Sequence, residues 1–125
     1  MLSDGRVYAA VPAQDLDRAR RFYSEKLSLE PAEEGGGGLY YDASGGTRFL
    51  LFPTGGAPSG THTQVAFEVA DLDQEVKELR SRGVEFAEYD FPGLKTENGI
   101  AATPDGRAAW FMDSEGNVLG VFERA

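Results

Sequence analysis

The sequence predicts an α+β fold in which two tandem βαβββ modules form a curved, half-open mixed β-sheet cup with helices outside. Two observations predict this fold. The tripeptide Asp-Leu-Asp occurs at residues 15–17 and again at residues 71–73, each time after an apolar run and before a helix-like stretch. The polar turns at residues 42–46 and 113–117 each separate two further apolar runs. Such repetition indicates one structural unit present twice, with a concave surface shared between the copies.

The first unit begins with residues 7–11, an apolar run that predicts a buried strand ending at Pro12, because proline donates no hydrogen bond to a sheet. Asp15 is suited to cap the helix that follows. The apolar residues of this helix recur at the spacing of one helical face: Leu16, Ala19, Phe22, Tyr23 and Leu27. Residues 39–41 and 49–52 predict the next two strands of the unit.

The chain is predicted to form a single domain over residues 1–125, with module one at about 5–53 and module two at about 63–124. The linker between them, about 53–62, is rich in proline and glycine. In module two, Asp71 is expected to cap the helix and Gly83 to end it. We expect its strands at residues 64–69, 84–89, 108–112 and 118–122, with an extra polar loop at residues 91–106.

Composition narrows the possible functions. The chain has no cysteine, which excludes disulfides, thiolate nucleophiles and cysteine metal sites. Its 12 basic and 21 acidic residues give a net charge of −9, which disfavours binding to nucleic acid or to an anionic membrane. We find neither a signal sequence nor an apolar run long enough to span a bilayer, so the expected location is the cytoplasm.

These features resemble the vicinal oxygen chelate (VOC) superfamily, the glyoxalase, bleomycin-resistance protein and dioxygenase group. The resemblance rests on the strand before residues 15–17, the segment Arg21-Phe22-Tyr23 with Leu27, residues 66–73 and the closing turn at residues 113–117. It covers nearly the whole chain and implies a glyoxalase/bleomycin-resistance-like fold. It also implies a homodimer, often with clefts at or near the interface. The superfamily contains both enzymes and drug-binding proteins, so the resemblance alone does not choose between them.

Catalytic members of the superfamily hold a divalent metal with four cavity-facing side chains, typically His, Gln or Glu. Carrying this pattern over by its spacing from the repeated motifs gives Tyr8, Leu50, Gln64 and Gly120. Leucine and glycine offer no ligand atom, and a phenol is a poor ligand for such metals unless it is deprotonated. Because a catalytic metal site usually needs about three protein ligands, we expect no metal and no cofactor here.

The same cavity positions predict a ligand-binding surface. Trp110 could form part of an aromatic wall, and Glu68 is expected on the concave face, where it would attract a cation. His62, the only histidine, lies two residues before Gln64 and could act with it as a relocated metal site or a general base; alternatively it lies exposed at the start of the strand. The predicted ligand-binding residues are Tyr8, Leu50, His62, Gln64, Glu68, Trp110 and Gly120.

The leading hypothesis is a metal-independent, glyoxalase/bleomycin-resistance-like protein that binds a small aromatic or cationic ligand in the cleft between the modules. No catalytic residue is assigned. The first alternative is a VOC-type enzyme, either a glyoxalase, isomerase, lyase or dioxygenase-like protein with an atypical or lost metal site, or a metal-free catalyst using His62 or Glu68. The second is an interaction module whose cavity is filled by its own side chains.

Overall fold

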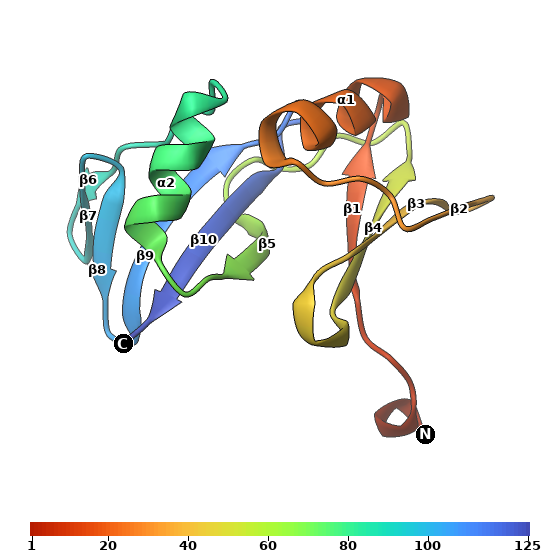
Figure 1. The fold of residues 1–125 in the computed structure, drawn as a ribbon, viewed down its shortest axis with the longest axis horizontal. Helices are drawn as coiled ribbons and strands as arrows, with labels where there is room; N and C mark the ends of the chain where they lie inside the picture. The colour runs from red at the N-terminus through yellow and green to blue at the C-terminus, as the bar shows by residue number, and fades with distance from the viewer.

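A computed structural model describes all residues, 1–125, and contains two α-helices and two mixed β-sheets (Figure 1). The helices are α1 (Leu16–Leu27) and α2 (Leu72–Ser81). Short 3-10 helices lie at Leu2–Asp4 and Ser44–Gly46. The strands are β1 (Ala9–Ala13), β2 (Glu33–Gly35), β3 (Gly38–Asp42), β4 (Arg48–Pro53), β5 (Thr63–Glu68), β6 (Asp90–Phe91), β7 (Leu94–Glu97), β8 (Ile100–Thr103), β9 (Gly106–Met112) and β10 (Val118–Arg124). The predicted α+β class is therefore confirmed.

The two sheets have the same plan. Sheet one has the order β1-β4-β3-β2, with β1 parallel to β4 and the remaining pairs antiparallel. Sheet two has the order β5-β10-β9-β8-β7-β6, with β5 parallel to β10 and the remaining pairs antiparallel. Below, module one denotes β1–β4 with α1, and module two denotes β5–β10 with α2.

Both helices begin as the repeated Asp-Leu-Asp motif predicts. The Asp15 side chain accepts a hydrogen bond from the Arg18 backbone N–H at 3.0 Å, and the Asp71 side chain accepts one from the Gln74 N–H at 3.1 Å. Each aspartate thus satisfies a backbone donor that the first helical turn leaves free.

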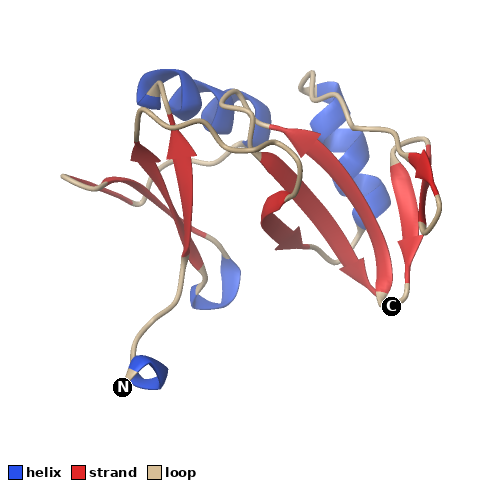
Figure 2. Ribbon diagram, turned by 180° about the vertical axis from the view of Figure 1, so that it is seen from behind, coloured by secondary structure: helices blue, strands red, loops and turns tan.

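Figure 2 shows sheet two from the side opposite to α2, where no helix covers its strands.

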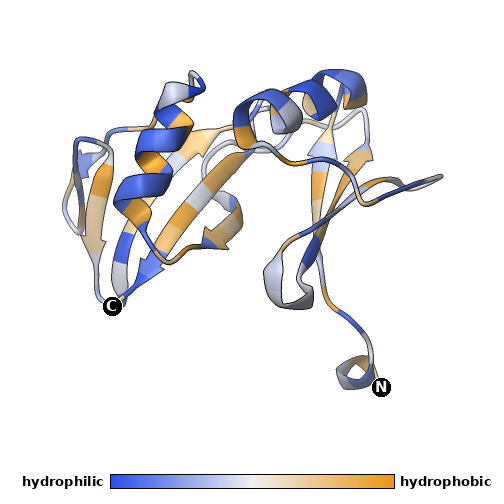
Figure 3. Ribbon diagram, in the orientation of Figure 1, coloured by the Kyte–Doolittle hydropathy of each residue, from blue (hydrophilic) through white to orange (hydrophobic).

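Alternating side chains of the strands separate a core face from an open face. Val11, Leu51, Leu119 and Val121 are buried in one hydrophobic core, together with Tyr23 of α1. In Figure 3 the hydrophobic residues concentrate in the strands of both sheets, whereas the helices are largely hydrophilic on their outer sides. No helix is long and apolar enough to cross a bilayer.

A buried polar joint connects module one to the β9–β10 turn of module two. The Tyr23 hydroxyl donates to Asp113 Oδ2 at 2.7 Å, and Asn117 Nδ2 donates to the backbone oxygen of Pro12 at 2.9 Å. Glu115 accepts the Asp15 backbone N–H at 2.9 Å and the Arg18 guanidinium at 2.7 Å. Away from this joint the two sheets diverge, toward the side where the N-terminus lies (Figures 1 and 2).

Three expectations about individual elements are wrong. The first strand begins at Ala9 rather than residue 7 and continues through Pro12, which is tolerated because β1 is an edge strand; Val7 is exposed. Residues 84–89 form no strand, since only Phe86 makes a bridge, to Phe111. Residues 91–106 are not one polar loop: they contain β7 and β8, joined by the tight turn at Asn98 and Gly99, both with positive φ.

Candidate functional site

The repeat defines equivalent positions on the open faces of the two sheets. Ala10 pairs with Leu50 between β1 and β4, and Ala66 pairs with Gly120 between β5 and β10. Across the antiparallel neighbour, Leu50 pairs with Tyr40 and Gly120 pairs with Trp110. Leu50 and Gly120 therefore occupy the same place in the two modules, as do Tyr40 and Trp110.

The residues at the four family metal positions do not form a metal site. Tyr8 packs edge-to-face against Tyr40, with ring centroids 5.7 Å apart, and raises the pKa of the Tyr40 phenol. Gln64 Nε2 donates to the backbone oxygen of Ala10 at 3.5 Å. Leu50 and Gly120 supply no ligand atom. Only Tyr8 and Gln64 carry a ligand atom, so this donor set does not fit the metal that the family implies.

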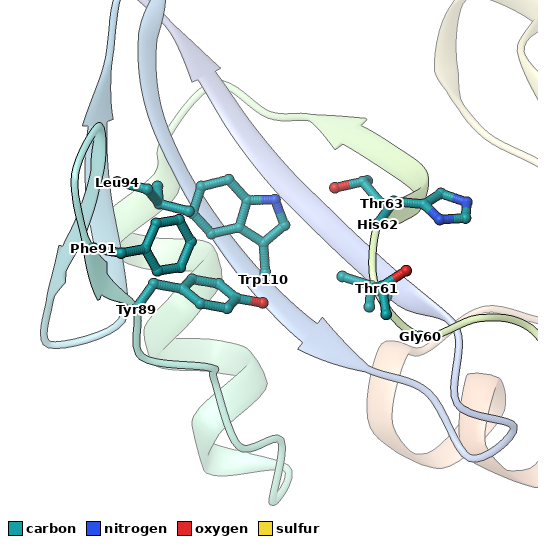
Figure 4. Close-up of a pocket in the computed structure, with 9 residues that line it drawn as sticks. Gly60, Thr61, His62, Thr63, Tyr89, Phe91, Leu94 and Trp110 are labelled. Atoms are coloured by element: carbon teal, nitrogen blue, oxygen red, sulfur yellow. The ribbon is translucent and has the colours of Figure 1, made fainter.

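The open face of module two carries a pocket of about 400 Å³, with an aromatic wall (Figure 4). Tyr89 packs edge-to-face against both Phe91 and Trp110, with centroid distances of 5.8 and 5.7 Å. Leu94 of β7 extends this wall. The volume lies in the range of small-molecule sites, which are mostly apolar with a few polar groups.

The opposite side of the pocket is formed by the segment leading into β5, Gly60–Thr63. The Thr63 hydroxyl points toward the indole in Figure 4, whereas the Thr61 hydroxyl points away from it and donates to the Ser59 hydroxyl at 3.0 Å. The His62 imidazole points away from the aromatic wall in Figure 4, and its Nδ1 lies 3.0 Å from the Ser59 hydroxyl. The nine residues that line the pocket include no Asp, Glu, Lys or Arg. Any charged ligand would therefore lack an opposite charge within the pocket itself.

A second cavity, a groove of about 650 Å³, lies between the modules and is lined from β1, β4, β5 and the turn before β4. Gln64, Glu68 and Arg48 lie in this groove. The Glu68 carboxylate accepts a hydrogen bond from Arg124 at 2.8 Å, and its side chain is 58% exposed. Glu68 is thus ion-paired at the surface rather than free in an apolar cleft.

The predicted site residues therefore divide among three places. Trp110 and His62 line the module-two pocket, with Gly120 beneath the indole of Trp110. Gln64 and Glu68 line the groove, while Tyr8 and Leu50 lie on the open face of module one. A shift of register between Val118 and Leu119 explains part of this division, because it interrupts the alternation that would place His62 and Gln64 on one face.

Sequence reasoning missed the aromatic wall contributed by Tyr89, Phe91 and Leu94, because that stretch was read as the end of a strand followed by a polar loop. A signal was present. Tyr89 and Phe91 stand two residues apart, the spacing that puts both side chains on one side of an extended segment. Nothing local indicated that this segment folds back over Trp110.

Comparison with known proteins agrees with this architecture. The sequence profile of the Glyoxalase/Bleomycin resistance protein/Dioxygenase superfamily matches residues 5–120, so the chain belongs to this superfamily. A search of functionally curated proteins gave no match.

Among solved structures, the chain is similar to TnmS3, an antibiotic binding protein from Streptomyces sp. CB03234, with a TM-score of 0.72, 26% identity and 97% of each chain covered. It also resembles a glyoxalase family protein from Bacillus anthracis, with a TM-score of 0.74, 21% identity and coverage of 97% of this chain and 95% of that one. The fosfomycin resistance protein FosX from Listeria monocytogenes has a TM-score of 0.67 at 14% identity, covering 97% of this chain and 93% of that one, which shows the shared fold alone.

Proposed function

We propose that this protein binds a small, planar aromatic molecule without a metal, in the pocket on the open face of module two. The observation that carries the proposal is the wall of Tyr89, Phe91 and Trp110 around a pocket without charged lining residues. Aromatic rings favour edge-to-face and offset-stacked contacts with another ring. The Thr63 hydroxyl on the opposite side could accept a hydrogen bond from, or donate one to, a polar edge of the ligand. The similarity to an antibiotic binding protein supports the same class of function.

A neutral ligand suits this pocket better than a cation. Glu68, the carboxylate expected from the sequence to attract a cation, lies in the groove and is paired with Arg124. The net charge of −9 would still concentrate cations near the surface. Two probes with the same bicyclic ring separate these effects: quinoline, which is neutral at pH 7.5, and N-methylquinolinium, which is a cation.

The test is a titration of the purified protein with each probe, in which the fluorescence of the single tryptophan, Trp110, is measured. We expect saturable quenching by quinoline at pH 7.5, with weaker binding of N-methylquinolinium, and a rise in the unfolding temperature with quinoline because a ligand of the folded state stabilises it. Tetramethylammonium, which has no ring, should leave both readouts unchanged. Absence of saturable binding by quinoline would contradict the proposal, as would a stoichiometric divalent metal in the purified protein.

The alternative of a metal-free enzyme has one observation in its favour, the presence of His62 beside the pocket. His62→Ala should leave quinoline affinity unchanged under either function, so the two are separated by turnover, which a binding protein lacks both before and after this change. An enzyme using His62 as a base should lose turnover while keeping affinity.

We further propose that the protein is a cytoplasmic homodimer. The open faces of both sheets support a dimer, because they expose Tyr8, Phe91 and Met112, whose exposed fractions are 43%, 53% and 53%. Small-angle scattering at several concentrations should give the mass of two chains, and the mass of one chain at all concentrations would contradict the dimer.

A further inference from the structure

The duplicated modules differ at one pair of equivalent residues in a way that bears on where a ligand can bind. In module two, Gly120 lies directly opposite Trp110 on the antiparallel strands β10 and β9. In module one, the equivalent pair is Leu50 opposite Tyr40. Side chains directly opposite each other in a sheet share a face and compete for the same space.

Glycine at position 120 is explained by the space that the indole needs and not by an unusual backbone conformation. A Cβ atom at position 120 would lie 3.4 Å from both Cδ1 and Nε1 of Trp110, and 3.4 Å from Cγ2 of Thr63. The φ angle of Gly120 is not among the positive values found at other glycines of the chain. An L-residue can therefore adopt this backbone, and the constraint on position 120 is the space that Trp110 fills.

Displacing the indole would disturb the whole aromatic wall. Trp110 meets the ring of Tyr89 at an interplanar angle of 74°, and Tyr89 meets Phe91 at 66°. Each ring is positioned by contact with the next. A side chain larger than a methyl group at position 120 would overlap the indole and force it out of this arrangement.

In module one, the position equivalent to Gly120 is occupied by a larger residue, Leu50. Opposite Leu50, Tyr40 packs against Tyr8 and lies under the Arg48 guanidinium, which is 5.0 Å from the ring centroid. Neither Tyr40 nor Leu50 lines the aromatic pocket or the groove. The two modules thus differ at this place both in the residue, leucine or glycine, and in the packing of the aromatic ring opposite it.

We propose that Gly120 is the specificity-determining residue of the module-two pocket. By having no side chain it allows the Trp110 indole to lie against β10 and complete the aromatic wall that selects planar aromatic ligands. This inference rests on the proposed function for its ligand. Its structural part, the positioning of the indole by Gly120, stands independently of that function.

The test compares Gly120→Val with Gly120→Ala and with the matched control Leu50→Ala. In the ligand-free protein, we expect Gly120→Val to shift the Trp110 emission to longer wavelength and to increase its quenching by acrylamide, because the indole moves toward solvent. Gly120→Ala and Leu50→Ala should leave the emission unchanged, because a methyl group at position 120 makes only ordinary van der Waals contact with the indole. Quinoline affinity should fall at least tenfold in Gly120→Val and should be unchanged in Gly120→Ala and in Leu50→Ala.

A second background separates indole displacement from general damage to the sheet. In Trp110→Leu, quinoline binding should already be weak, and adding Gly120→Val should weaken it no further. If Gly120→Val does not fold, Gly120→Ser, whose side chain also extends beyond a methyl group, carries the test, and unchanged emission together with unchanged quinoline affinity in that variant overturns the inference. Failure of the wild-type protein to bind quinoline would overturn only the proposed function, since the emission of the ligand-free variants still tests the role of Gly120.

Discussion

At the scale of single residues, Glu115 shows how one buried carboxylate links the two modules. Its side chain is fully buried and accepts hydrogen bonds from the Asp15 backbone N–H, the Arg18 guanidinium and the Ser114 hydroxyl. The Arg18 hydrogen bond is the main reason that the pKa of Glu115 falls to about 2. The carboxylate also lies at the N-terminus of α1, where negative charge is favoured by the helix dipole.

The lowered pKa predicts how stability depends on pH. A carboxylate whose pKa is lower in the folded state than its ordinary value near 4.5 stabilises the protein above that value, and this contribution is lost as the pH falls toward 2. Urea unfolding should therefore show that Glu115→Gln loses roughly 2 kcal/mol less unfolding free energy than the wild-type protein as the pH falls over this interval. This value allows for the solvent exposure of the Arg18 partner. The exposed Glu25 provides the control, since Glu25→Gln should lose stability in parallel with wild type. Parallel curves for Glu115→Gln would contradict the assignment.

At the scale of elements, the run of four glycines at residues 35–38 contains positions with opposite requirements. Gly38, at the start of β3, has a φ of +130°, and a Cβ there would lie 2.1 Å from the Leu51 backbone oxygen. Gly36, at the tip of the same hairpin, has no atom within 4 Å of its Cβ position and no positive φ. The sequence alone predicts a turn here but does not distinguish the two glycines.

Alanine substitution should separate them. Gly38→Ala should lower the free energy of unfolding by about 2 kcal/mol or more, because a backbone oxygen of β4 must move away from the new methyl group. Gly36→Ala should be neutral or stabilising by up to about 1 kcal/mol, because it reduces the freedom of the unfolded chain. Thermal or urea unfolding of the two variants measures both effects, and equal effects would show that the hairpin lies differently against β4.

The elements also show which features the sequence could predict. The N-caps Asp15 and Asp71 and the hairpin strands around residues 42–46 depend on neighbours in sequence, and the structure confirms them. The β7–β8 hairpin was missed, although its turn Asn98-Gly99 is a strong local signal, because the surrounding residues are polar.

At the scale of the whole molecule, a polar joint and a shared hydrophobic core connect the two modules. Tyr23, Asp113 and Asn117 connect α1, the β9–β10 turn and β1 through buried hydrogen bonds, and the sheets diverge from there. The duplication predicted from sequence correctly gave the fold and the equivalence of Leu50 with Gly120. The duplication could not predict the pocket. The segment that carries Tyr89 and Phe91 has no counterpart in module one, and it packs against Trp110 through contacts between residues distant in sequence.

The central claim, that module two binds a planar aromatic molecule on its open face, is tested most directly by NMR chemical-shift mapping of the wild-type protein with quinoline. We expect saturable shifts that are largest at the Trp110 indole N–H and at the backbone amides of Thr61, Thr63 and Tyr89. Shifts centred instead on Ala66 and Glu68 would place the ligand in the groove between the modules, and that result, or the absence of any saturable shift, would contradict the claim.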